Sequence, residues 1–236
     1  MMWVRRSNQR GHFDHGWLKT WHTFSFGQYQ DPQFIGFESL RVINEDFISP
    51  NQGFGEHGHQ DMEILTWVLE GRLSHAVSLG NRDSIVPLHA QIMSAGTGIR
   101  HSEFNSSLEA RVHLLQVWII PSHQGLHPRY DQVQLSPTQV ANRWATLASC
   151  NPVEGALTIF QDVDISVARL DLGMKLDVSI RPGRSAWLQV VRGEVRIGGE
   201  HLRTGDAIAE EEVGTLEMYS LEMGSEVLWF DLAKRP

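Results

Sequence analysis

The apolar residues of this chain occur in short bursts that are rich in β-branched and aromatic side chains. Examples are SLRVIN (39–44), EILTWVLEG (63–71), RVHLLQVWII (111–120), AWLQVVRGEV (186–195) and VLWFDL (227–232). Gly, Pro, Asn or Asp separates most of these bursts, as expected for short strands joined by turns. The sequence therefore predicts an all-β fold, either a sandwich or a barrel.

Helix signals are confined to one segment. Ser136 is suited to cap a helix, Pro137 suits the first helical position, and Gln139 completes a capping box. The residues that follow, RWATLAS, fit a strand as well as a helix. We therefore expect one short helix, near residues 137–142.

The two halves of the chain repeat one pattern at low similarity. In the first half TWVLEGRL is followed by a turn, a strand and HLLQVWI; in the second half LQVVRGEV is followed by a turn, a strand and VLWFDL. Aligning Gly71 with Gly193 superposes two copies of one β unit. The polar segment HQGLHPRYDQVQLSP lies between the copies. We expect an N-terminal domain over residues 1–132 and a C-terminal domain over residues 133–236.

Charge and composition exclude several classes of protein. The 236 residues include 28 acidic and 20 basic ones, which gives a formal net charge of −8, and there is no dense Lys/Arg stripe. Direct binding to nucleic acid is therefore not expected. No apolar run approaches the ~18 residues of a membrane span, and the N-terminal segment has no signal-peptide pattern. Cys150 is the single cysteine, expected to be half-buried, so we predict a cytoplasmic protein without disulfides.

Two short clusters carry the chemistry: HGH, with His57 and His59, and HSE, with His101 and Glu103. Residues two apart on a strand point to the same face, so adjacent strands would direct three imidazoles and a carboxylate inward. These donors favour a divalent transition metal over calcium or magnesium, and they leave coordination positions open. Iron is the first expectation, and nickel, copper, cobalt, manganese or zinc would suit the same donors.

The carboxylate ligand is ambiguous from spacing alone. Glu63 shares strand parity with His57 and His59, whereas Glu103 shares parity with His101. The remaining histidines have no partner at ligand spacing, His75 and His113 among them, and the pair His12 and His15 near the N-terminus is expected to be structural. Nothing in the sequence gives His22 a chemical role.

The second copy of the repeat has lost these residues. The alignment sets Ser179, Arg181 and Ser185 opposite His57, His59 and Glu63, and it sets Leu216 and Met218 opposite His101 and Glu103. The C-terminal domain is therefore expected to hold no metal and to serve a structural role.

The motifs HxH(x)3E, which begins at His57, and G(x)2H(x)3N, which begins at Gly98, resemble those of the cupins. The chain as a whole resembles the pirin family, through RGHFDHGWLKTWHTFSF, DPQFIGFESLRVINED, GFGEHGHQDMEILTWVLEG and MSAGTGIRHSEFN, and less specifically as far as VLWFDL. The resemblance implies two cupin-type (jelly-roll) β-barrels packed face to face, with the metal in the N-terminal one. It favours Glu103 as the fourth ligand and leaves Glu63 to hydrogen-bond a ligating imidazole.

A divalent ion held by three neutral imidazoles and one carboxylate keeps a net positive charge, which favours an anionic oxygen ligand beside dioxygen. A flavonol or another enolisable substrate would bind in this way, and Glu103 would take its proton if it alternates between ligand and general base. The pirin resemblance specifies a metal-dependent dioxygenase similar to quercetin 2,3-dioxygenase, which opens the central ring of a flavonol and releases carbon monoxide. The expected partners are a small planar aromatic substrate and dioxygen.

Other functions use the same residues. The resemblance also implies a non-enzymatic, metal-binding regulator that docks on a transcription factor or a metabolic enzyme. A cupin isomerase or sugar-binding protein would use the metal only as a Lewis acid. An apolar pocket large enough for a planar aromatic molecule would favour the dioxygenase, whereas a shallow site under a flat surface would favour the regulator.

Overall fold

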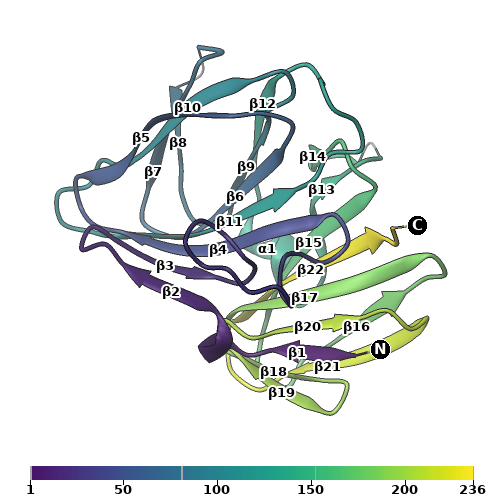
Figure 1. Ribbon diagram of the computed structural model, residues 1–236. Coiled ribbons are helices and arrows are strands. Elements are labelled where there is room, and N and C mark those ends of the chain that lie inside the picture. The colour runs from purple at the N-terminus through teal and green to yellow at the C-terminus, as the bar shows by residue number, and fades with distance from the viewer. Residues whose placement is uncertain (1, 81, 152, 236) are drawn as a thin grey trace. The chain divides into compact units, whose positions relative to one another are not determined.

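The protein is built almost entirely from strands (Figure 1). The computed structural model describes residues 2–80, 82–151 and 153–235. Its contacts divide the chain into two compact units. The N-terminal barrel comprises Gly11–Gln134 and Ile159–Gln161, and the C-terminal barrel comprises the described residues up to Arg10, Leu135–Thr158 and those from Asp162 onward. The predicted all-β class is confirmed.

The N-terminal barrel has a seven-stranded sheet, in the order β12-β9-β6-β11-β4-β3-β2, and a four-stranded sheet, in the order β5-β10-β7-β8. Its strands are β2 (Gly11–Asp14), β3 (Leu18–His22), β4 (Leu40–Ile48), β5 (Gln52–His59), β6 (Glu63–Glu70), β7 (Leu73–Val77), β8 (Arg82–Ile85), β9 (His89–Ser94), β10 (Ile99–Asn105), β11 (Val112–Ile119) and β12 (Arg129–Gln134). Its core includes a cluster of buried apolar residues around Leu114 and another around Met93.

The C-terminal barrel repeats this plan with a seven-stranded sheet, β1-β20-β17-β22-β15-β13-β14, and a four-stranded sheet, β16-β21-β18-β19. Its strands are β1 (Trp3–Arg5), β13 (Ala145–Ser149), β14 (Leu157–Thr158), β15 (Val163–Leu170), β16 (Lys175–Ile180), β17 (Arg184–Arg192), β18 (Glu194–Ile197), β19 (Glu200–Arg203), β20 (Ala207–Glu210), β21 (Gly214–Ser220) and β22 (Ser225–Ala233). Its core includes a cluster of buried apolar residues that contains Leu188 and Val227.

The glycines that the sequence alignment paired occupy equivalent turns. Gly71 follows β6 with φ +81°, and Gly193 follows β17 with φ +74°. A β-carbon at Gly71 would lie 2.4 Å from the carbonyl oxygen of Arg111, and one at Gly193 would lie 2.5 Å from Oγ of Ser225. Both turns require glycine for its conformational freedom and its lack of a side chain. The internal repeat is therefore structural as well as sequential.

The short helix is confirmed as α1 (Pro137–Val140), which begins with the predicted capping box between Ser136 and Gln139. The ambiguous segment after it forms strand β13. A 3-10 turn, η1, covers Ser7–Gln9. Cys150 is half-buried, as expected. No helix of the described residues is long and apolar enough to cross a membrane.

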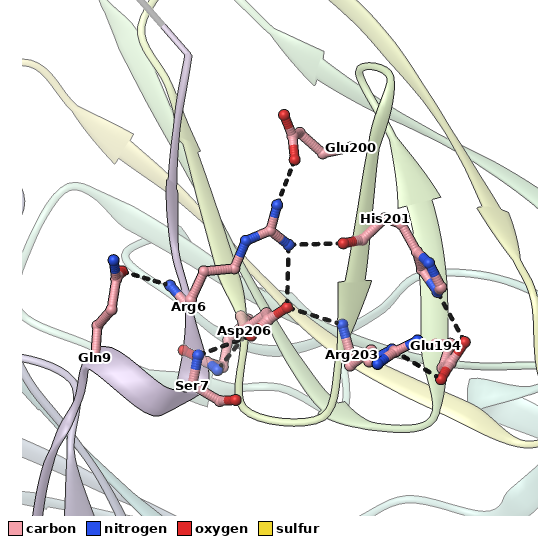
Figure 2. Close-up of polar contacts among 9 residues, drawn as sticks. Arg6, Ser7, Gln9, Glu194, Glu200, His201, Arg203 and Asp206 are labelled. Carbon is pink, nitrogen blue, oxygen red and sulfur yellow. Dashed lines mark hydrogen bonds and ion pairs between the residues drawn. The ribbon is translucent and has the colours of Figure 1, made fainter.

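The start of the chain differs from the expected domain division, because it belongs to the C-terminal barrel. Strand β1 pairs with β20, in the sheet position that β12 holds in the N-terminal barrel. Figure 2 shows how the residues after β1 are held: Arg6 donates to the carbonyl of His201 (2.7 Å) and to Asp206 (3.2 Å), and the Ser7 amide donates to Asp206 (2.7 Å). Strand pairing and these polar contacts, rather than sequence order, place this segment in the C-terminal barrel.

Candidate metal centre

The two predicted clusters lie on neighbouring antiparallel strands of the four-stranded sheet of the N-terminal barrel. His57 and His59 are on β5, and His101 and Glu103 are on β10, with His101 directly opposite His57. A bulge between His101 and Glu103 shifts the register, so that Glu103 pairs with Phe54. Alternation along both strands points the four side chains to the same face of the sheet.

Three imidazoles converge at this point. The Nε2 atoms of His59 and His101 are 2.9 Å apart, and the rings of His57 and His101 have centroids 4.3 Å apart. The potential ligand atoms of His57, His59 and His101 all lie within 4.8 Å of one another. Two nitrogens bound to one ion at ~2.1 Å and at a right angle are about 3.0 Å apart. The observed separation of His59 and His101 therefore fits a single transition-metal ion.

Hydrogen bonds at Nδ1 orient two of the three rings. Nδ1 of His57 lies 2.8 Å from the carbonyl oxygen of Gly55, to which it donates, and this leaves Nε2 for a ligand. Nδ1 of His101 lies 2.6 Å from Nε2 of His75. Contacts of this kind fix the tautomer and the ring plane of a metal-binding histidine.

Two of the three imidazoles, those of His59 and His101, are held neutral. Burial, followed by the neighbouring His57, lowers the pKa of His59 to about 4, and burial together with His75, His57 and His59 lowers the pKa of His101 to about 2. Because a metal binds the unprotonated ring, these histidines are ready to bind an ion at neutral pH.

Glu103 belongs to an adjoining group rather than to the three converging imidazoles. Its carboxylate oxygens accept from Nε2 of Gln116 at 3.3 and 3.1 Å, and Oε1 lies 3.9 Å from Nδ1 of His101 and 3.8 Å from Nε2 of His75. His75, His101 and Glu103 thus form a second set of potential ligands that shares His101 with the first. Burial, with a further contribution from Asp46, raises the pKa of Glu103 to about 8 against the opposing effect of Gln116.

Sequence reasoning missed His75, which is almost fully buried and contacts His101 directly. It lies on β7, where it pairs with Glu103 on β10. No regular spacing in the sequence joins His75 to His101, so only the pairing of β7 with β10 brings it to the site. Burial also lowers its pKa, to about 4.

The expectation that Glu63 hydrogen-bonds an imidazole is wrong. Its carboxylate accepts instead from the Ser94 hydroxyl (2.9 Å) and from the amide of Phe160 (3.3 Å). Glu63 lies on β6, in the seven-stranded sheet, where its cross-strand partner is Ser94. The hydrogen bonds of Glu63 therefore connect that sheet to the segment around Phe160 and do not involve the histidines.

A cavity of about 480 Å³ opens beside the histidines. Its lining comprises Phe13, His15, Leu18, Thr20, His22, Phe26, Gly27, Gln28, Asn44, Asp46, Phe54, His57, His59, Glu103, Gln116 and Trp118. The indole of Trp118 meets His59 edge to face at 5.0 Å and donates to Gln116 (3.0 Å). His15, which was expected to be structural, and His22, which the sequence left without a chemical role, both lie in this wall. The cavity is wide enough for a planar aromatic molecule and is lined by several aromatic rings.

The C-terminal barrel has a different interior at the matching place. Both groups of potential metal ligands in the described part of the chain lie in the N-terminal barrel. Where the alignment sets Arg181 opposite His59, the guanidinium of Arg181 pairs with Asp231 (2.6 Å), which also pairs with Arg184 (2.7 Å). Met218, aligned with Glu103, is buried in the apolar core.

Fold and site together define a bicupin whose N-terminal barrel carries a histidine-rich, metal-binding centre. The family model of pirin matches residues 3–119, and that of the quercetinase C-terminal cupin domain matches residues 146–232. The chain belongs to the pirin family, which confirms the resemblance seen in the sequence.

Curated relatives match almost the whole chain. It is 44% identical over 232 residues to the quercetin 2,3-dioxygenase of Escherichia coli K12, covering 98% of this chain and 99% of that protein. It is 41% identical over 236 residues to a putative quercetin 2,3-dioxygenase of Pasteurella multocida, covering 98% and 100%. The crystal structure of the Escherichia coli bacterial pirin YhhW in complex with nickel(II) superposes with a TM-score of 0.94 at 43% identity, covering both chains completely.

Proposed function

We propose that this protein is a metal-dependent dioxygenase that cleaves a flavonol such as quercetin and releases carbon monoxide. The observation that carries the proposal is the aromatic-lined cavity of about 480 Å³ that opens onto His57 and His59, two of the three converging imidazoles. The names of the relatives from Escherichia coli and Pasteurella multocida support the same substrate class. In the overall reaction both atoms of dioxygen enter the ring-opened product, and one ring carbon leaves as carbon monoxide.

The proposed metal ligands are His57, His59, His101 and Glu103. The three imidazoles form one set of donors, and Glu103 lines the same cavity as His57 and His59. When bound, a divalent transition metal supplies Lewis acidity and a template that holds substrate and dioxygen together. Iron remains the first expectation, and nickel is supported by its presence in the structure of the Escherichia coli relative.

The side chains of the cavity accept the substrate proton, orient the substrate and exclude water. Glu103 is buried with a raised pKa, so it is suited to accept the proton of the flavonol 3-hydroxyl at a carboxylate oxygen and to hold it in a dry site. Gln116 keeps this carboxylate in place through Nε2. Trp118, Phe26 and Phe54 provide flat apolar surfaces that orient an aromatic ring and exclude water.

The regulator alternative predicts a shallow site under a flat surface. The size of the cavity and the number of aromatic side chains in its wall favour the dioxygenase instead.

Oxygen uptake tests the proposal. Protein loaded separately with iron(II), nickel(II), cobalt(II) or manganese(II) is mixed with quercetin in an oxygen electrode, and carbon monoxide is measured in the headspace. We expect uptake that depends on the metal and falls about 100-fold or more in Glu103→Gln, because the variant loses the proton acceptor. If no flavonol is consumed with any of these metals, the enzymatic proposal fails and the regulator is favoured.

A further inference from the structure

One wall of the cavity carries two buried polar side chains, each with one oxygen atom that has no hydrogen-bond partner among the described residues. Asn44 and Asp46 lie two residues apart on β4 and therefore face the same way, into the cavity. Their cross-strand neighbours on β3 are His22 and Thr20, and those on β11 are Gln116 and Leu114. The pair thus lies in the middle of the seven-stranded sheet, between two strands that also line the cavity.

Both side chains are hidden from solvent, with relative exposures of 3% for Asn44 and 4% for Asp46. Among the residues that the structure describes, no group donates a hydrogen bond to Oδ1 of Asn44 or to Oδ1 of Asp46. A buried acceptor without a donor costs folding free energy, and most such groups in proteins find a partner. Since both atoms are acceptors, the missing partner must be a hydrogen-bond donor.

The neighbouring polar residue, Gln116, has hydrogen-bond partners for both its amide nitrogen and its amide oxygen. Gln116, directly opposite Asn44 in the register, donates from Nε2 to Glu103 and accepts at Oε1 from the indole of Trp118. The unpartnered oxygens of Asn44 and Asp46 lie on β4, the strand that pairs with β11 at Gln116. The cavity also has apolar surfaces in Phe13, Phe26 and Phe54, so it presents one hydrogen-bonding wall and other walls that suit an aromatic ring.

We infer that Asn44 and Asp46 determine specificity by accepting hydrogen bonds from phenolic hydroxyl groups of the substrate. This inference rests on the proposed function, in which one end of the substrate binds the metal. It narrows the substrate class to planar aromatic molecules with a metal-binding oxygen pair at one place and hydroxyl donors at another. A flavonol that carries several ring hydroxyls meets this description, and 3-hydroxyflavone, which has only the metal-binding pair, does not.

The ionisation of Asp46 is compatible with this role. Burial, together with the nearby Glu45, raises its pKa to about 7, and a hydrogen bond from Thr20 opposes the rise. The ionised carboxylate and the neutral carboxyl group each keep an oxygen that can accept from a hydroxyl.

Equilibrium binding separates this role from a purely structural one. Nickel(II)-loaded protein is titrated by calorimetry under nitrogen with quercetin and, separately, with 3-hydroxyflavone. We expect Asp46→Leu and Asn44→Leu, which keep the branched shape of the side chain but remove its acceptor oxygens, to weaken quercetin binding about tenfold or more and to change 3-hydroxyflavone binding by less than about twofold. Asp46→Asn keeps an acceptor oxygen and should stay within about threefold of the wild type for both ligands.

Phe54→Leu is the matched control, because it alters an apolar part of the same cavity and should weaken both ligands by a similar factor. Melting curves and nickel content verify that each variant is folded and loaded; if Asp46→Leu does not fold, Asn44→Leu carries the test. Equal losses for quercetin and 3-hydroxyflavone in the leucine variants overturn the inference. Discriminating binding without oxygen uptake would instead leave the inference standing and reject the dioxygenase.

Discussion

The two barrels share one strand plan and differ in how their interiors handle charge. In the N-terminal barrel, the neutral imidazole of His59 and the buried carboxyl groups of Glu103 and Asp46 face a cavity, and none of the described residues that line it is Lys or Arg. In the C-terminal barrel, a smaller cavity of about 340 Å³ has its carboxylates already paired, since Arg181 and Arg184 both contact Asp231. The same arrangement of strands therefore gives the N-terminal barrel side chains that can bind a metal cation. In the C-terminal barrel, arginine side chains of the protein itself supply the positive charge. Function follows the side chains and not the fold.

The largest expected effect is the loss of metal from the N-terminal barrel alone. His57→Ala and His101→Ala each remove one of the three converging donors, so the purified variants should lose most of the roughly one equivalent of metal expected for the wild type. Elemental analysis by mass spectrometry measures this. Arg181→Ala, at the position aligned with His59, is the control and should keep its full metal content. Full retention in both histidine variants would refute the ligand assignment.

The second effect is on the stability of the C-terminal barrel. Arg184 is nearly buried against Asp231, which is itself 6% exposed, so Arg184→Leu leaves a buried carboxylate with only Arg181 as its partner. We expect a loss of about 2–3 kcal/mol in the free energy of unfolding, measured with urea. Arg181→Leu removes an exposed guanidinium and should cost less than ~1 kcal/mol. Equal costs would contradict the idea that this interior depends on a buried pair.

His75 should act on metal affinity without binding the metal itself. It contacts Nδ1 of His101 at 2.6 Å, and residues that orient a ligand typically change metal affinity 10–100-fold. His75→Leu should therefore weaken nickel(II) binding by about this factor in a competition titration with a chelator. His113→Leu, which removes a buried histidine paired with Glu45 (2.9 Å), is the control and should leave the affinity unchanged. An unaltered affinity in His75→Leu would show that His101 is oriented without it.

The smallest effect concerns pH. The pKa of Glu103 is raised to about 8 from its ordinary 4.5, so between these values the folded metal-free protein binds more protons at this group than the unfolded chain does. Glu103 therefore lowers stability progressively as pH rises from about 4.5 to 8. Glu103→Gln should raise the melting temperature at pH 8 more than at pH 5, whereas Glu56→Gln, at an exposed position, should change neither. Equal gains at both pH values would contradict the raised pKa.

The sequence predicted the parts of the site that depend on local periodicity. His57, His59, His101 and Glu103 follow the alternation of two strands, and the repeat around Gly71 and Gly193 identified the barrel without these ligands. The sequence did not predict roles for His75 and Asp46, because each reaches the site through strand pairing between segments far apart in the sequence. The interactions of Glu63 were predicted wrongly for the same reason, since its partners are Ser94 on β9 and the distant Phe160.

Strand β1 has a consequence for how the protein is made. Its residues 3–5 pair with residues 207–209, so the entire N-terminal barrel lies between the two partners in the sequence. At about 5–20 residues per second, β1 leaves the ribosome some tens of seconds before β20 exists. During that interval the N-terminal barrel can fold and β1 cannot, while β20 emerges as an open sheet edge until β1 reaches it. The C-terminal barrel can therefore be completed only after β20 has been made, and a segment fused directly before Trp3 would interfere with that barrel rather than with the one that follows it in the chain.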